Sequence, residues 1–233
     1  MRYLITFVHR HLDFRLPELD AMLRMQGLEP AAVYSKADFD PRQPYLAVEF
    51  PNEVTAQVVC ERAILIRSVM ELWADSETYE GLVEATKNLP GELTTPRFEP
   101  HLSWAVHVDA FGLSHSLESQ EEIRLNFRHL EFQGPVRCKN PDQCFWVIER
   151  YPPRAASEGP VPAGSVPDRV FFGREIAREG SRSLVSQCDL KKRLYLGPTW
   201  APFYSRPRHS PQRSRPAVAS LVASDPWTTS CPS

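Results

Sequence analysis

Long apolar runs, paired cysteines and strong charge of one sign are all missing from this 233-residue chain. No apolar run approaches the roughly 18 residues of a membrane-spanning helix. The first eight residues are too short, and too polar at their flanks, for a signal peptide. The five cysteines are odd in number and form no C-x-x-C pair, which disfavours a disulfide framework and a zinc ribbon. The cytosol is therefore the expected compartment.

The formal charge of the whole chain is only −2, which argues against general attraction to nucleic acid through net charge. This balance is uneven along the chain. Residues 200–233 carry four arginines against one aspartate, a balance of +3 that leaves −5 for residues 1–199. Any phosphate binding must therefore come from local clusters of basic side chains.

Signatures of independent catalysis are missing as well. The chain contains no G-x-S-x-G motif, P-loop or dinucleotide-binding fingerprint. Cys138 and Cys144 flank a predicted turn, but two ligands do not complete a tetrahedral zinc site and no histidine has the usual spacing from them. His9 and His11, close to Asp13, are more simply explained as surface or hydrogen-bonded structural residues than as a catalytic pair.

The first 73 residues alternate between strand and helix patterns. Helices are predicted from about residue 16 to 26 and from 53 to 62, the second capped by Asn52. Strands are predicted at 2–8, 31–35, 46–50 and 64–73, of which 31–35 is the weakest. The order βαββαβ is that of a ferredoxin-like, split βαβ unit.

A second region with both helices and strands follows. Ser76 is the expected cap of one helix, and Ser119 with Glu122 is the expected capping box of another. Strands are predicted at 104–108, 134–138, 143–151 and 170–172, the last ended by Gly173. Residues 152–167 contain five prolines and two glycines, offer no apolar face and are predicted to form a loop.

The segment from Asp168 to Thr199 reads DRVFFGREIAREGSRSLVSQCDLKKRLYLGPT. A helix is predicted after its first strand, capped by Ser181 or Ser183 and terminated by the Gly-Pro of its last residues. FFGR, DLKKRLYLGPT and the upstream HLDFRLPEL resemble the catalytic subunit of the eukaryotic tRNA (guanine-10, N2)-methyltransferase. The resemblance covers residues 1–199.

The resemblance implies an RNA-binding THUMP region joined to a Rossmann-type methyltransferase domain. It further implies S-adenosylmethionine as methyl donor, the exocyclic amine of a tRNA guanosine as acceptor, and a small zinc-binding activator subunit as partner. The match stops at Thr199, which the family continues with Ser-Met and this chain with Trp200. The glycine loop and the Pro-Pro tetrad of the methyltransferase domain are absent, so no cofactor site is expected in this chain.

The sequence thus predicts an α+β protein in four parts. These are an N-terminal ferredoxin-like domain (1–75), a THUMP-like domain (76–180), a linker helix (181–199) and a disordered tail (200–233). The tail has many prolines and serines and almost no periodicity. An altered reading frame, a retained intron or an alternative exon after Thr199 would explain why it departs from the family.

Basic residues around the last predicted strand and the linker helix form the predicted RNA-binding surface. They are Arg169, Arg174, Arg178, Arg182, Lys191, Lys192 and Arg193. Cations on one rigid module can follow phosphates without reading bases. The alternative is a solvated face whose lysines complement a helix end, and Glu175 and Glu179 interrupt the cluster.

The leading hypothesis is tRNA binding without catalysis. The alternatives are a silent RNA- or protein-interaction module and a gene-model product with no activity.

Overall fold

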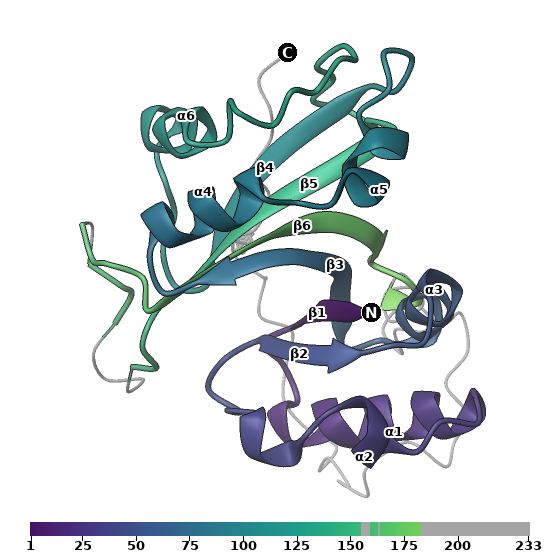
Figure 1. Cartoon of the computed structure of the whole chain (residues 1–233). Coiled ribbons are helices and arrows are strands. Elements are labelled where there is room, and N and C mark those ends of the chain that lie inside the picture. Colours follow the sequence, from purple (N-terminus) through teal and green to yellow (C-terminus); the bar gives the residue numbers. More distant parts are fainter. Residues whose placement is uncertain (155–158, 163, 183–233) are drawn as a thin grey trace, which may run out of the picture. The chain divides into compact units, whose positions relative to one another are not determined.

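A computed structural model of the chain describes residues 1–154, 159–162 and 164–182 (Figure 1). The chain divides into two units, Met1–Ser186 and Gln187–Ser233, and all described residues belong to the first. The linker helix and the disordered tail predicted beyond Arg182 lie outside the described residues.

A six-stranded mixed sheet with the order β2-β1-β3-β6-β5-β4 organises the first unit (Figure 1). Its strands are β1 (Arg2–Phe7), β2 (Tyr45–Glu49), β3 (Ile66–Ser76), β4 (Trp104–Ala110), β5 (Gln143–Arg150) and β6 (Arg169–Arg178). All neighbours are antiparallel except β4 and β5. The predicted α+β class is confirmed. Because β3 pairs with β6, one sheet runs through both predicted domains, and their proposed boundary falls at the end of β3.

Six α-helices accompany the sheet in the described part of the chain. They are α1 (Arg15–Met25), α2 (Pro30–Val33), α3 (Glu53–Arg62), α4 (Tyr79–Lys87), α5 (Gly91–Thr94) and α6 (Leu117–Leu125). Both α3 and α4 pack on β3 and β6, and α6 packs on β4. Asn52 caps α3 as predicted, because its side-chain oxygen accepts the Thr55 N–H at 2.9 Å.

Two predicted helix caps are wrong by a few residues. Ser76 is the last residue of β3, and the cap of α4 is Thr78, whose hydroxyl accepts the Gly81 N–H at 3.1 Å. Likewise α6 is capped by Ser116, so Ser119 lies in its first turn and donates its backbone N–H to the cap. Neighbouring Ser and Thr residues are equally good caps, so the sequence alone does not separate them.

Two predicted strands are also wrong. Residues 30–33 form α2, because Pro30 at the first helical position needs no N–H partner and its fixed φ suits a helix start. The first 76 residues therefore contribute three strands rather than the four of a βαββαβ unit. The strand predicted at 134–138 is reduced to a single bridge between Val136 and Trp104.

Gly173 lies inside β6 instead of ending it. A Cβ at this position would clash with the carbonyl oxygen of Glu71 and lie 2.9 Å from Met70 Cγ, so β3 approaches too closely for any side chain. A glycine within a strand often marks such a close approach. The prediction that it ends the strand was wrong, and β6 continues to Arg178.

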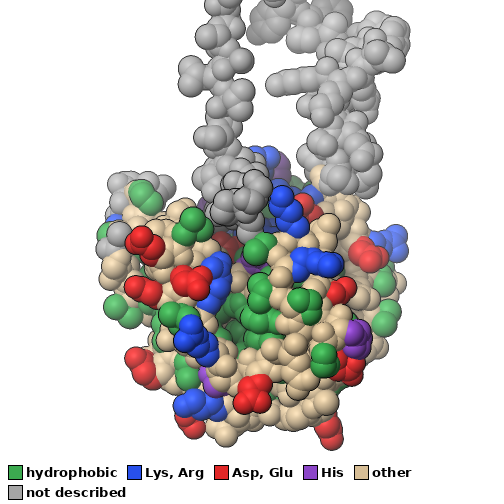
Figure 2. Space-filling model, turned by 90° about the horizontal axis from the view of Figure 1, so that it is seen from above, with side chains coloured by type: hydrophobic (Ala, Val, Ile, Leu, Met, Phe, Trp, Pro, Cys, Tyr) green, Lys and Arg blue, Asp and Glu red, His purple; other side chains and the backbone are tan. Residues whose placement is uncertain are grey.

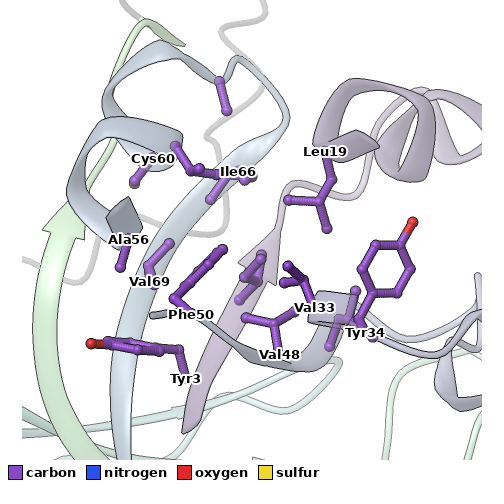
Figure 3. Close-up of a cluster of buried hydrophobic side chains, with 14 of the residues drawn as sticks. Tyr3, Leu19, Val33, Tyr34, Val48, Phe50, Ala56, Cys60, Ile66 and Val69 are labelled. Atoms are coloured by element: carbon purple, nitrogen blue, oxygen red, sulfur yellow. The ribbon is translucent and has the colours of Figure 1, made fainter. Parts of the chain in front are cut away.

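Apolar side chains fill both faces of the sheet. Along β1, Tyr3 (Figure 3) and Ile5 belong to the cluster built with α1, α2 and α3, whereas Leu4 belongs to a separate cluster on the opposite face. A second cluster packs β5 and β6 against α4 and α6. Alternate residues of a strand point to opposite faces, so this burial explains why β1 is apolar at successive positions. That feature was predicted from its sequence.

Candidate nucleic-acid interface

The N-terminal end of β6 carries the first predicted RNA-binding residue, Arg169. Its guanidinium pairs with Asp75 of the neighbouring strand β3. Asp75 also accepts from Arg2 Nη1 at 3.1 Å, and the Arg2 and Arg169 side chains are 54% and 40% exposed. One carboxylate thus serves two arginines.

Arg174, in the middle of β6, lies inside the protein and is only 8% exposed. Its Nη2 donates to Glu53 Oε2 at 2.6 Å and its Nε to Glu71 Oε2 at 3.2 Å. Arg97 approaches the same two carboxylates at 3.9 and 3.7 Å. Nearby, burial and then Glu71 raise the pKa of Tyr3 to about 12. These surroundings favour a structural role for Arg174, and its contact with RNA stays a prediction.

The C-terminal end of β6 is held against the end of α3. Ser181 Oγ donates to the backbone oxygen of Glu61 at 2.7 Å. A Cβ at Gly180 would clash with the backbone oxygen of Cys60. These close contacts fix the backbone just before Arg182. Through these contacts, the backbone at Gly180 and Ser181 lies against the last turn of α3, which ends at Arg62.

Arg178 shares this end of the strand. Its guanidinium lies 4.6 Å from the centre of the Trp146 ring and 3.8 Å from Glu175 Oε2. Burial raises the pKa of Glu175. We call Arg62, Arg178 and Arg182 the α3-end arginines. Within the described residues no ion pair engages Arg62 or Arg182, whereas Glu61, Glu175 and Glu179 lie among them in the chain.

The described arginines predicted to bind RNA do not form one patch. Arg169 and Arg178 lie about 30 Å apart, at about 3.3 Å per strand residue, and Arg174 is buried between them. Arg178 and Arg182 are four residues apart in the chain, at the C-terminal end of β6. Arg62 was not singled out from the sequence, because a basic residue in the last turn of a helix indicates only dipole complementation. Lys191, Lys192 and Arg193 lie outside the described residues.

Figure 2 shows the same interspersion of charge on a larger scale. On the face seen from above in Figure 1, basic and acidic side chains are interspersed instead of separating into regions of one sign. This arrangement agrees with the small net charge of the chain. Contacts with a polyanion would therefore depend on a few positioned cations.

A cavity of about 400 Å³ lies beside the ends of β4 and β5. Phe111 and Gly112, which follow β4, and Tyr151, which follows β5, line it together with His9 and Gln43. The sequence analysis did not predict this site. Its lining residues come from four separate stretches of the chain, and none of them belongs to a recognisable motif.

Arg15, at the first position of α1, lies behind the wall of this cavity and is 0% exposed. Its Nε and Nη2 donate to Val8 O at 3.0 and 2.8 Å, and its Nη1 donates to Pro41 O and Gln43 O at 3.1 Å. No carboxylate among the described residues pairs with it. Burial lowers the pKa of Arg15 to about 10, so it remains charged at neutral pH.

His9 and Gln43 connect this buried charge to the cavity. Arg15 Nη2 lies 3.2 Å from His9 Nδ1, and burial together with the Arg15 charge lowers the pKa of His9. A neutral ring that accepts at Nδ1 carries its proton on Nε2. Gln43 is 7% exposed and donates to Tyr151 O at 2.6 Å, while its Oε1 has no donor among the described residues. His9 and Gln43 thus contribute one donor and one acceptor to the wall, which Arg42 and Arg154 also line.

The described residues show neither a membrane span nor a metal cluster. None of the helices in this part of the chain is long and apolar enough to cross a bilayer. The same residues contain no group of three or more His, Cys, Asp or Glu side chains placed to hold a metal ion.

The fold and the sequence together define the class of protein. The family profile described as "Tmrp11 THUMP N-terminal domain" matches residues 1–182, so this class is the N-terminal THUMP region. The chain belongs to this Tmrp11 family.

Similar proteins include the "tRNA (guanine(10)-N(2))-methyltransferase TRMT11" of Gallus gallus, 30% identical over 200 residues. The tRNA (guanine(10)-N(2))-methyltransferase of Saccharomyces cerevisiae is 30% identical over 201 residues. Each alignment covers 85% of this chain but only 41% and 44% of the relative, so the chain spans about two fifths of their length. TrmN from Thermus thermophilus is similar in structure, with a TM-score of 0.47, 19% identity and coverage of 78% of this chain and 48% of that one.

Proposed function

We propose that this chain binds tRNA as the N-terminal region of a tRNA (guanine-10, N2)-methyltransferase. The family match over residues 1–182 carries this proposal. The relatives are named as enzymes that act on guanosine 10 of tRNA, and the region shared with them precedes more than half of their length. Cytosolic location and a zinc-binding activator subunit belong to the same proposal.

The α3-end arginines are the part of the described surface best suited to phosphate contact. Arg178 and Arg182 are presented by backbone that is fixed against α3, so less conformational entropy is lost when they bind. Lys191, Lys192 and Arg193 begin nine residues after Arg182 in the chain and are proposed as further phosphate contacts. Arg169, which shares Asp75 with Arg2, supplies a second proposed contact at the far end of β6.

The described residues do not fit S-adenosylmethionine. Nucleotide-type cofactors need a glycine loop after a parallel strand, where the backbone can approach the ligand closely. The only described strand followed directly by a parallel neighbour is β4, and it leads into a single glycine, Gly112. We therefore assign methyl transfer to the part of the relatives that this chain does not match. The purified chain is expected to give no saturable heat with S-adenosylmethionine in calorimetric titration.

Mobility shift with a tRNA transcript over a salt series tests the proposal. Log affinity should fall linearly with log salt, by about 0.7 to 0.9 per phosphate contact. Replacing Lys191, Lys192 and Arg193 together by Ala should reduce this slope by roughly two to three units. Phosphate contacts carry no sequence information, so binding should weaken equally for different tRNAs.

A matched control removes the same charge elsewhere. Lys36, Lys87 and Lys139 are exposed and lie on three other parts of the domain, so their triple Ala variant should leave the slope nearly unchanged. Equal losses in the two triple variants would show that only net charge matters. Absence of any tRNA binding by the parent chain at 50 mM salt would refute the proposal and favour a protein-interaction module.

A further inference from the structure

A second cavity, of about 430 Å³, lies between α4, α5 and the segment that follows α6. We call it the α4–α5 cavity. Thr86, Lys87 and Leu89 line it at the C-terminal end of α4, and residues within 94–99 and 129–133 supply its other walls. Its volume lies in the range of ligand sites, about 300 to 1,000 Å³. None of the basic residues proposed to contact tRNA lines it.

Hydrogen bonds between these stretches hold the walls of the α4–α5 cavity in place. His129 Nε2 lies 2.9 Å from Thr86 Oγ1, which joins the segment after α6 to α4. The Gln133 backbone N–H donates to Phe98 O at 3.2 Å, which joins the same segment to the stretch after α5. The cavity is therefore formed before any ligand arrives, and a preformed site loses little conformational entropy on binding.

The floor of the α4–α5 cavity is apolar. Leu130, 6% exposed, belongs to the hydrophobic cluster that packs β5 and β6 against α4 and α6, and Leu89 and Phe98 pack against the same cluster. The ring of Phe98 is held by that of Phe132, whose centre lies 4.3 Å away. An apolar floor with a polar opening suits a side chain that buries an aliphatic stem and keeps a charged head in water. Lysine and arginine are side chains of this kind.

The charge at the opening of the α4–α5 cavity is negative. Glu99 and Glu131 both line it and are both exposed. Glu131 has no ion pair in the described part of the chain, and Glu99 lies 3.3 Å from His101, which is charged only when protonated. Lys87, also in the lining, lies 3.5 Å from Glu84, so its charge is offset. The two carboxylates of the lining therefore favour a cation at the opening.

The charge of the wider region has the same sign. Residues 77–133 contain ten Asp and Glu against four Lys and Arg, whereas the whole of residues 1–182 contains 27 against 20. Nearly all the excess negative charge of residues 1–182 thus lies in the stretch that forms the α4–α5 cavity. Such a surface repels a phosphate backbone and attracts a basic protein segment.

We propose that the α4–α5 cavity receives a lysine or arginine side chain from a basic segment of a partner protein. The aliphatic stem of this side chain lies on the apolar floor, and its cationic head lies beside Glu99 and Glu131. Thr95 and Gln133, which also line the cavity, offer hydrogen-bonding groups to the main chain of the segment. This contact goes beyond the proposed tRNA binding and does not depend on it, because it uses a surface of the opposite charge.

Three fluorescein-labelled decapeptides with the repeat X-Ala test this contact, each titrated with the 233-residue chain by fluorescence anisotropy at pH 7 and low salt. X is Lys, Glu or diaminobutyric acid, which carries the lysine charge on a stem two methylenes shorter. The Lys peptide should bind saturably, and the Glu peptide should not. The diaminobutyric acid peptide should bind about tenfold more weakly, because it buries less of its stem on the apolar floor. Equal affinities of the two cationic peptides would overturn the proposal, because the cavity would then add nothing to the attraction of charge.

Two double variants that remove the same charge locate the contact. Glu99→Gln combined with Glu131→Gln should weaken binding of the Lys peptide about tenfold. Glu118→Gln combined with Glu122→Gln, at exposed positions of α6 outside the cavity, should change it by less than about twofold. Equal losses in the two double variants would assign binding to net charge and overturn the site.

Two further titrations separate other occupants. If spermidine binds as tightly as the Lys peptide in calorimetry and loses its affinity in the Glu99→Gln, Glu131→Gln variant, the cavity is a polyamine site and the protein assignment is overturned. The tRNA affinity of the same variant should be unchanged or slightly higher, and a lower one would make RNA the occupant. If the parent chain binds no tRNA, the proposed function fails, and the peptide titrations alone decide whether the α4–α5 cavity binds a basic segment.

Discussion

Two buried arginines, Arg174 and Arg15, occupy contrasting surroundings in the same domain. Arg174 is 8% exposed and contacts Glu53 and Glu71, whereas Arg15 is 0% exposed and contacts three backbone oxygens and the His9 ring. The first charge is cancelled where it lies, and the second is not. Burial alone therefore does not show how the charge of a buried arginine is compensated. Its hydrogen-bond partners do.

The difference in charge compensation also predicts how much folding stability is lost when each arginine is replaced. A buried ion pair costs desolvation energy on both sides, so it adds little net stability, but removing one partner leaves the other charge stranded. Around Arg15 the stranded groups would be neutral carbonyl oxygens, whose loss of a donor costs less than an uncompensated carboxylate. The Glu71 region should therefore be the more sensitive of the two.

The largest loss of folding stability is expected for a substitution in β6. Arg174→Met leaves Glu71, itself 5% exposed, with Arg97 and the Trp73 indole as its side-chain partners among the described residues. The free energy of unfolding should fall by about 3 kcal/mol in urea denaturation. Arg178→Met, at the partly exposed end of the same strand, removes a 3.8 Å pair with Glu175 and the contact with the Trp146 ring, and should cost about 1 to 2 kcal/mol. Equal losses of unfolding free energy in the two variants would show that the buried ion pairs of Arg174 contribute no more than the partly exposed pair of Arg178.

A smaller loss of folding stability is expected when Arg15, behind the cavity wall, is replaced. Arg15→Met removes the donors of Val8 O, Pro41 O and Gln43 O but also relieves a buried charge. The two changes oppose each other, and the net loss should be about 2 kcal/mol in the same denaturation experiment. Arg15→Lys, which keeps the charge without the planar fork, should recover only part of it. A more stable Arg15→Met variant would mean that the uncancelled charge dominates.

The smallest effect concerns pH and His9. Its pKa is lowered from 6.5 in the folded protein, first by burial and then by Arg15. The unfolded chain therefore takes up this proton more readily, so the stability contribution is complete above pH 6.5 and declines as the pH falls through that value. NMR titration of the His9 ring should show an inflection below 6.5 that moves upward in Arg15→Met. Identical His9 titrations in the parent chain and in Arg15→Met would show that Arg15 does not lower the pKa of His9.

Much of the fold was predictable because it depends on local patterns. The alternation of Tyr3 and Ile5 with Leu4 indicated a strand covered on both faces, and Asn52 was visible as the cap of α3. The errors arose where tertiary contacts decide. Gly173 resembles a strand end until the backbone of Glu71 is seen to pass against it. The short α2 follows from a proline whose context suits either a helix start or an extended segment.

The candidate site was much less predictable. Arg174 belongs to a basic sequence cluster, but its partners Glu71 and Glu53 lie 103 and 121 residues away in the chain. No local pattern shows that these carboxylates enclose it. Arg15 lies in an ordinary helix start, and its burial becomes apparent only when β1 and residues 41–43 surround it. Charge compensation is a property of the assembled fold.

Side-chain ¹H–¹⁵N NMR of the 233-residue chain, recorded with and without tRNA, compares Arg174 with Arg178 in a single measurement. The Arg178 Nε–H reports on the α3-end arginines, and the Arg174 Nε–H reports on the buried ion pair. We expect the Arg178 signal to shift on saturation with tRNA while the Arg174 signal keeps its position. A shifted Arg174 signal beside an unchanged Arg178 signal would contradict both assignments, because it would make the cancelled charge the one that contacts RNA.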